Sequence, residues 1–93
     1  MNIKPQLEDL RLFCVVVRKR SFAATARELG VSKAVVSKRI ALLEDALQDR
    51  LLHRTTRSVS LTAQGEIVHQ WAQRILEDVD LMGDALAHEK ATP

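Results

Sequence analysis

The chain has 93 residues, of which 46% are hydrophobic and 28% are charged, with a net charge of +2. This composition suits one small globular domain and argues against a disordered tail. The single cysteine excludes an internal disulfide, and so short a domain commonly gains stability from an oligomer partner. No apolar run approaches the roughly 20 residues of a membrane span, and the N-terminus does not resemble a signal peptide. We therefore expect a cytosolic protein that does not contact a membrane.

The net charge conceals two regions of opposite sign. Residues 18–57 hold ten Lys and Arg against four Asp and Glu, whereas the rest of the chain holds four against eight. A basic region of this kind is expected of a surface that binds nucleic acid. On charge alone, a solvated charged surface with no ligand is an equal alternative.

The first half of the chain predicts three short helices, each with one apolar face. The first helix follows Pro5, and its apolar face consists of Leu7, Leu10, Phe13, Cys14 and Val17. The second begins at the N-cap Ser21 and ends at Gly30, with Phe22, Ala26 and Leu29 on its apolar side. The third begins at the N-cap Ser32, and its core-facing stripe consists of Val36, Ile40, Leu43 and Leu47.

The second and third helical patterns meet at Gly30-Val31, which is typical of a helix-turn-helix. In this motif the second helix, residues 32–47 here, reads duplex DNA. An arc clear of the core-facing stripe carries Lys33, Ala34, Ser37 and Lys38. The sequence therefore predicts a mainly α chain with this arc as its recognition face.

Residues 52–61 predict a small two-stranded hairpin, because they are rich in β-branched residues and partly alternate in polarity. A long helix capped by Thr62 then runs from Ala63 to about residue 88. Its apolar positions recur at steps of three and four: Val68, Trp71, Ile75, Val79, Met82 and Leu86. So small a domain cannot bury the whole of this heptad seam, so we expect a second copy of the chain to pair along it.

Several blocks of the chain, in this order, resemble the N-terminal DNA-binding domain of LysR-type transcriptional regulators of bacteria. They are Leu10-Arg11-Leu12-Phe13, SFAATARELGVS at residues 21–32, Val36-Ser37-Lys38-Arg39-Ile40, Leu43-Glu44, Leu52-His53-Arg54-Thr55-Thr56-Arg57 and Leu61-Thr62-Ala63-Gln64-Gly65. The resemblance implies a winged helix-turn-helix over residues 1–61, a linker helix over 62–90 that forms a homodimer, and a short tail at 91–93. It also implies a larger C-terminal domain that senses a small molecule and allows a tetramer in a full-length protein; we expect the 93 residues to be a DNA-binding piece without that domain.

On this interpretation the recognition helix enters a major groove, with Lys33, Ala34 and Ser37 at base edges. Lys38 is expected on a phosphate. Arg54, Thr55 and Arg57 belong to the wing, where a guanidinium can reach the adjacent minor groove or its phosphates. Helix N-termini attract anions, so Ser21, Ser32 and Thr62 are further candidates for backbone contacts, with plain capping as an equal alternative.

Two positions depart from the family pattern. Many relatives have Gln-Pro after the capping serine, where this chain has Lys33-Ala34, and Gln48 replaces a usual glycine after the recognition helix. Lys favours guanine O6 and N7 or a phosphate, whereas Gln commonly pairs with adenine. The target preference is therefore expected to differ from that of typical members.

The remaining polar residues favour no catalytic or metal site. His53, His69 and His88 lack metal-ligand spacing, and Cys14 on an apolar face is expected to be a buried packing thiol. We expect neither cofactor nor enzyme activity, because no nucleophile has a paired base. The run Arg18-Lys19-Arg20 either contacts the DNA backbone or complements the dipole of the first helix. We favour the second alternative. A protein-interaction module would use the seam alone and leave the basic half unexplained.

Overall fold

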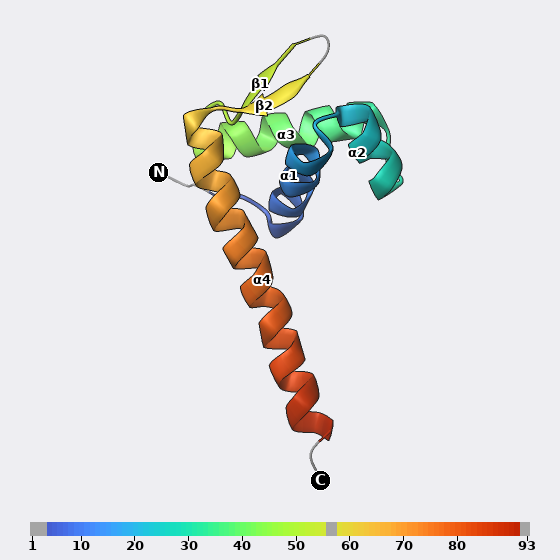
Figure 1. Ribbon diagram of the computed structural model, residues 1–93, viewed down its shortest axis with the longest axis vertical. Coiled ribbons are helices and arrows are strands. Elements are labelled where there is room, and N and C mark those ends of the chain that lie inside the picture. Colours follow the sequence, from blue (N-terminus) through green and yellow to red (C-terminus); the bar gives the residue numbers. More distant parts are fainter. Residues whose placement is uncertain (1–3, 56–57, 92–93) are drawn as a thin grey trace.

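The computed structural model describes residues 4–55 and 58–91. That part of the chain forms α1 (Leu7–Lys19), α2 (Phe22–Leu29), α3 (Lys33–Leu47), the strands β1 (Leu52–Arg54) and β2 (Val59–Leu61), and α4 (Ala63–Ala91). The strands pair antiparallel, with Leu52 opposite Leu61 and Arg54 opposite Val59. Figure 1 shows α1, α2 and α3 gathered in one body beneath the hairpin, while α4 runs away from it. The predicted mainly α winged helix-turn-helix is confirmed.

The core lies where α1 meets the other three helices. Its fully buried apolar side chains are Phe13, Val16, Val36, Ile40, Leu43 and Leu51. The predicted faces of the first two helices are wrong at their outer ends, because Leu7 and Leu29 are 45% and 38% exposed. Leu12 and Val15 are buried instead. Since α1 packs against helices on several sides, its buried surface is broader than one stripe.

The predicted N-caps of α2 and α3 are present. The hydroxyl oxygen of Ser21 accepts a hydrogen bond from the Ala24 N–H at 3.0 Å, and that of Ser32 accepts one from the Val35 N–H at 3.1 Å. Gly30 ends α2 with φ +69°, and Gln48 ends α3 with φ +57°. Gln48 therefore adopts the left-handed conformation that the family's usual glycine adopts most readily, and α3 still ends there.

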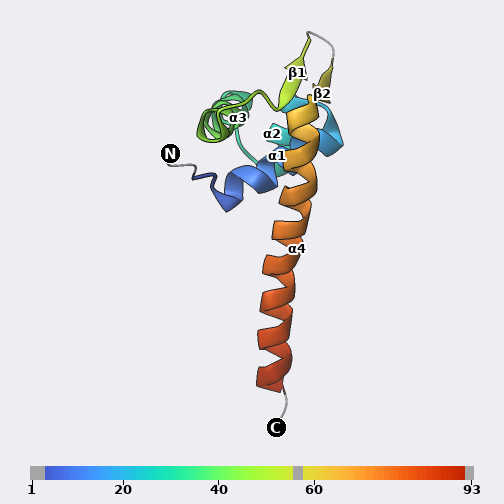
Figure 2. The same cartoon turned by 90° about the vertical axis from the view of Figure 1, so that its left-hand side faces the viewer.

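The two halves of α4 differ in packing. Gly65, Ala72 and Leu76 are buried against the body, whereas every residue from 80 to 91 is exposed. A Cβ at position 65 would overlap the carbonyl oxygen of Leu51, so only glycine fits at this position in the first turn of α4. Figure 2 shows the far half of α4 standing clear of all other elements. None of the described helices is long and apolar enough to cross a membrane.

Candidate nucleic-acid interface

An ion pair fixes the recognition helix α3 on α1. The Arg39 Nε donates to Asp9 Oδ1 at 2.7 Å, and a terminal guanidinium nitrogen donates to Oδ2 at 3.0 Å. Asp9 is only 5% exposed, whereas the Arg39 side chain is 38% exposed, so the carboxylate end of this two-point contact is removed from water. Its planar geometry limits rotation of α3 about its own axis, and the polar arc of α3 is thereby given a fixed direction.

The polar arc of α3 lies on the side away from the core, as predicted. Lys33, Ala34 and Lys38 are exposed and Ser37 is half-buried, whereas Val36 and Ile40 are fully buried. The first residue of α3 is therefore a solvent-exposed cation, and the next turn presents a small hydroxyl. Such an arc can enter a groove without the loss of core contacts.

Three parts of the chain meet around one open hollow of about 340 Å³. Its walls come from the start of α2, the start of α3 and the hairpin. They consist of Arg20, Ser21, Phe22, Ala23, Lys33, Ser37, Arg54, Thr55, Ser58 and Val59. The structure thus brings together Ser21, Lys33, Ser37, Arg54 and Thr55 from the predicted set. It adds Arg20, for which sequence reasoning left a DNA-backbone contact open and favoured the helix dipole.

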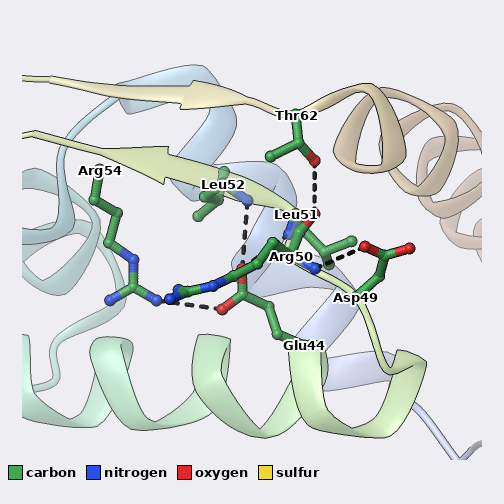
Figure 3. Close-up of polar contacts among 7 residues, drawn as sticks. All are labelled: Glu44, Asp49, Arg50, Leu51, Leu52, Arg54 and Thr62. Carbon is green, nitrogen blue, oxygen red and sulfur yellow. Dashed lines mark hydrogen bonds and ion pairs between the residues drawn. The ribbon is translucent and has the colours of Figure 1, made fainter.

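Glu44, near the end of α3, joins the recognition helix to the hairpin (Figure 3). One of its carboxylate oxygens accepts hydrogen bonds from the Leu51 and Leu52 N–H groups at 2.9 and 3.3 Å. The other lies 3.4 Å from a guanidinium nitrogen of Arg54. Glu44 is 7% exposed, so these contacts compensate a carboxylate that burial would otherwise destabilise. Sequence reasoning missed this role, because a single Glu at the end of a helix carries no local signal of burial.

Arg54 is the last residue of β1 and lies directly before the turn of the hairpin. Besides the contact with Glu44, its guanidinium carbon lies 4.8 Å from the centroid of the Phe22 ring. Two partners from α2 and α3 therefore hold this wing side chain against the body of the domain. The other predicted wing arginine, Arg57, lies outside the described residues.

The hydroxyl of Thr62 is used inside the fold. It donates to the carbonyl oxygen of Arg50 at 2.7 Å and accepts from the Gly65 N–H at 2.9 Å, and the residue is 7% exposed. A phosphate would have to displace one of these contacts. Of the two alternatives for Thr62, the structure favours capping.

The helices differ in the charge of their first turns. α1 has Glu8 and Asp9 there and α4 has Glu66, which is the arrangement that the helix dipole favours. The first turns of α2 and α3 contain no acidic residue, and α3 begins with Lys33. A cation at a helix N-terminus is locally unfavourable, so the helix dipole does not account for Lys33 at this position.

The basic run at the end of α1 is divided by the structure. Arg18 and Lys19 form ion pairs with Glu28 at 2.6 and 3.3 Å, and these join α1 to α2. The hydrogen bond from Arg18, assisted by Lys19, holds the pKa of Glu28 below its usual value. Arg20 follows α1 with φ +55° and faces the hollow instead. The three residues therefore have different surroundings although they are adjacent in sequence.

The predicted seam of α4 is only partly free. Val68 packs against the core cluster and Val79 is half-buried. Val68, which the sequence placed in the seam, packs against the core because the start of α4 contacts α1 and β2. The other seam residues are exposed: Trp71, Ile75, Met82 and Leu86. Trp71 is 57% exposed, and the Arg74 guanidinium lies 5.4 Å from its ring centroid.

Neither the cysteine nor the histidines gather into a site in the part of the chain that the structure describes. No group of three or more His, Cys, Asp and Glu could hold a metal ion there. Cys14 is half-buried, and burial raises the pKa of its thiol although Arg11 opposes the shift. His69 packs edge-on against Phe13, with ring centroids 6.2 Å apart. These surroundings are those of packing residues.

Comparison with known proteins agrees with this geometry. Residues 7–66 match the family described as "Bacterial regulatory helix-turn-helix protein, lysR family". The chain belongs to the LysR family. It is 57% identical over all 93 residues to the HTH-type transcriptional regulator DmlR of Escherichia coli (strain K12), and 39% identical over 88 residues, 95% of the chain, to the HTH-type transcriptional activator AaeR of the same strain. These matches span 30% and 28% of the two relatives, so the chain corresponds to less than a third of their length.

Solved structures extend the agreement to the whole fold. The BenM DNA-binding domain in complex with benA site 1 DNA has a TM-score of 0.89 at 32% identity, and covers 95% of this chain and 99% of that one. The CbnR DNA-binding domain in complex with DNA has a TM-score of 0.87 at 32% identity, and covers 91% and 98%. The chain thus contains the helix-turn-helix domain of the LysR family and has the fold of these DNA-binding domains.

Proposed function

We propose that this LysR-type domain binds duplex DNA sequence-specifically as a homodimer, with α3 of each copy in a major groove. The observation that carries the proposal is the exposed Lys33 at the N-terminus of α3, which lines one hollow together with residues of α2 and the hairpin. A major groove admits a helix, and a wing beside that helix can reach the adjacent minor groove or its phosphates. The domains of similar fold described above were solved in complex with DNA.

Base readout is assigned to Lys33, Ala34 and Ser37. Lys33 can donate to guanine O6 and N7, Ala34 can contact a thymine methyl, and Ser37 can donate or accept. Since Ala34 offers no hydrogen bond and Ser37 is half-buried, Lys33 contributes most of the discrimination. The target sites would accordingly differ from those of relatives with glutamine at this position.

Backbone contacts are assigned to Ser21, Ser32, Lys38, Thr55 and Arg57. The two capping hydroxyls accept hydrogen bonds within the fold and can still donate to a phosphate oxygen. We leave Thr62 out of this set because its hydroxyl already donates and accepts inside the fold. Arg54 is assigned a positioning role beside the turn of the wing, since Glu44 and Phe22 hold its guanidinium.

Dimerisation is assigned to the exposed part of the α4 seam, which consists of Trp71, Ile75, Met82 and Leu86. Two copies paired along α4 would place their recognition helices on two half-sites related by a two-fold axis. The expected operator is an inverted repeat with half-sites spaced by helical turns. A small-molecule effector would act through a further domain, which would also permit a tetramer, and chromosomal DNA as the partner places the protein in the bacterial cytoplasm.

The test combines selection of duplexes from a random pool with binding to the selected duplex at several salt concentrations. The logarithm of affinity should fall steeply with the logarithm of salt concentration, and the selected sites should contain two inverted half-sites. Binding that is absent, or that does not depend on salt, would contradict the proposal.

Two lysine variants separate base reading from backbone binding. Lys33→Ala should alter the preference at one position of each half-site by about 1–3 kcal/mol, because it removes a base-edge donor. Lys38→Ala should weaken binding to all sequences equally. A uniform loss for Lys33→Ala would make that residue a phosphate contact and would remove the assigned basis of specificity.

A further inference from the structure

The cations around the helix-turn-helix fall into two groups. In one group each guanidinium or ammonium has a carboxylate partner: Arg39 with Asp9, Arg18 and Lys19 with Glu28, and Arg54 with Glu44. Arg20 and Lys33 belong to the other group, because no ion pair within residues 4–55 and 58–91 includes them. Both line the hollow between α2, α3 and the hairpin. They are therefore its uncompensated positive charges among the described residues.

The backbone of Arg20 does not account for the presence of an arginine. Arg20 ends α1 with φ +55° and ψ +30°, and its N–H donates to the Val16 carbonyl oxygen at 2.7 Å. Glycine adopts this left-handed conformation without the steric cost that a Cβ brings. Glycine would form this turn with less strain than arginine. The arginine is therefore better explained by a role of its side chain than by the turn.

The position of Arg20 fits a phosphate group. It directly precedes Ser21 and the first turn of α2, whose Phe22 and Ala23 N–H groups have no acceptor within the helix. A guanidinium beside a capping hydroxyl and free amide groups matches the donors that bind phosphate oxygens. On its other side Arg20 lines a hollow of about 250 Å³ together with Glu66, but no ion pair joins these two residues. The guanidinium thus remains available to an external anion.

We propose that Arg20 binds a backbone phosphate of the duplex at the edge of the major groove entered by α3. The inference rests on the proposed DNA binding. It selects Arg20 alone from the run Arg18-Lys19-Arg20, for which the sequence left a backbone contact and a helix-dipole role open. In this arrangement Lys33 faces base edges, while Arg20 and the start of α2 hold the strand beside them. Arg20 therefore contributes affinity and register, and it does not contribute to base preference.

The test uses Arg20→Gly, which removes the guanidinium and keeps the left-handed turn. Binding to the selected duplex should weaken on the order of fivefold at 100 mM salt, equally for selected and unrelated duplexes, and the slope of log affinity against log salt should become shallower by about 0.9 per chain bound. Arg20→Lys should restore most of the slope, because it returns the charge. The thermal unfolding midpoint of Arg20→Gly should equal or exceed that of the wild type.

Arg27→Ala is the matched control. Arg27 is exposed in the last turn of α2 and does not line the hollow, so this variant removes one positive charge from the same helix-turn-helix without removing a proposed contact. An Arg20→Gly slope equal to that of the wild type or of Arg27→Ala would overturn the inference. A loss confined to one base pair would also overturn it, because Arg20 would then read a base. Wild-type protein that fails to bind any duplex would instead refute the proposed function.

Discussion

The body of the domain and the far half of α4 are both helical, but different contacts support them. In the body, buried apolar side chains are accompanied by ion pairs that join α1, α3 and the hairpin. Residues 80–91 are all exposed, although Leu81, Met82 and Leu86 are large and apolar, and the far half of α4 stands clear of the body (Figure 2). Isolated helices of this length are marginally stable in water. The body can therefore fold from its own contacts, whereas the far half of α4 exposes apolar side chains that the proposed dimer would cover.

The largest expected effect is in the core of the body. Phe13→Ala should lower the free energy of unfolding by about 3–5 kcal/mol, because it empties the centre of a fully packed cluster. The matched control is Leu81→Ala, which removes a side chain that is 54% exposed and lies outside the proposed seam, and which should change the free energy by less than about 0.5 kcal/mol. Urea unfolding followed by circular dichroism measures both, with Phe13→Leu as the milder variant should alanine prevent folding. Similar losses for Phe13→Ala and Leu81→Ala would contradict the division between the two regions.

A smaller loss is expected where the body holds the wing. Glu44→Gln should cost about 1.5–3 kcal/mol, since a charged acceptor of two backbone N–H groups and a partner of Arg54 becomes neutral. The neighbouring exposed Asp45→Asn serves as the control and should be close to neutral. Hydrogen exchange should show faster exchange of the Leu51 and Leu52 amides in Glu44→Gln alone. Unchanged protection of these amides would remove Glu44 from its positioning role.

Two adjacent residues on different sides of α4 test which side of the helix forms the dimer seam. Met82→Glu should weaken the dimer at least about tenfold, equivalent to about 1.4 kcal/mol, because it places a charge in the proposed seam. Leu81→Glu places the same charge about 100° around the helix and should leave the dimer intact. Sedimentation analysis of the two variants shows which of them still forms a dimer. If both variants or neither became monomeric, the assigned seam would be incorrect.

The smallest effect concerns the ion pairs of Glu28 with Arg18 and Lys19. Because its folded-state pKa is lowered, Glu28 contributes stability above its unfolded pKa and loses that contribution as the pH falls through the folded value. Glu28→Gln should therefore lower the thermal unfolding midpoint slightly at pH 7 and match the wild type under strongly acidic conditions. Added salt should reduce the difference at pH 7 further, since these side chains are solvent-accessible. If the difference in unfolding midpoint between Glu28→Gln and the wild type grew as the pH fell, the assigned role of Glu28 would be incorrect.

The sequence predicted most of the fold because its signals are local. Ser21 and Gly30 mark the ends of α2, Ser32 marks the start of α3, and the steps of three and four in α4 mark a long amphipathic helix. The recognition arc at Lys33 also followed from helical geometry alone. Each of these features depends on residues within a few positions of one another.

The remaining parts of the site depend on contacts between residues distant in sequence. Glu44 became a structural acceptor because the turn after α3 brings the Leu51 and Leu52 amides onto it. Val68 packs against the core because the start of α4 contacts α1 and β2. Nothing in the local pattern around either residue signals these contacts. Their roles follow from how elements pack, which periodicity does not encode.

The sequence by itself determined the helices, the turn between α2 and α3 and the polar face of α3 that we propose meets DNA, since capping and helical periodicity act over one or two turns. Only the tertiary structure decided which cations have carboxylate partners. It paired Arg18, Lys19, Arg39 and Arg54, and among the described residues it left Arg20 and Lys33 beside the hollow without one. The physical reason is that an ion pair requires two side chains within about 4 Å, and packing brings together residues up to 30 positions apart.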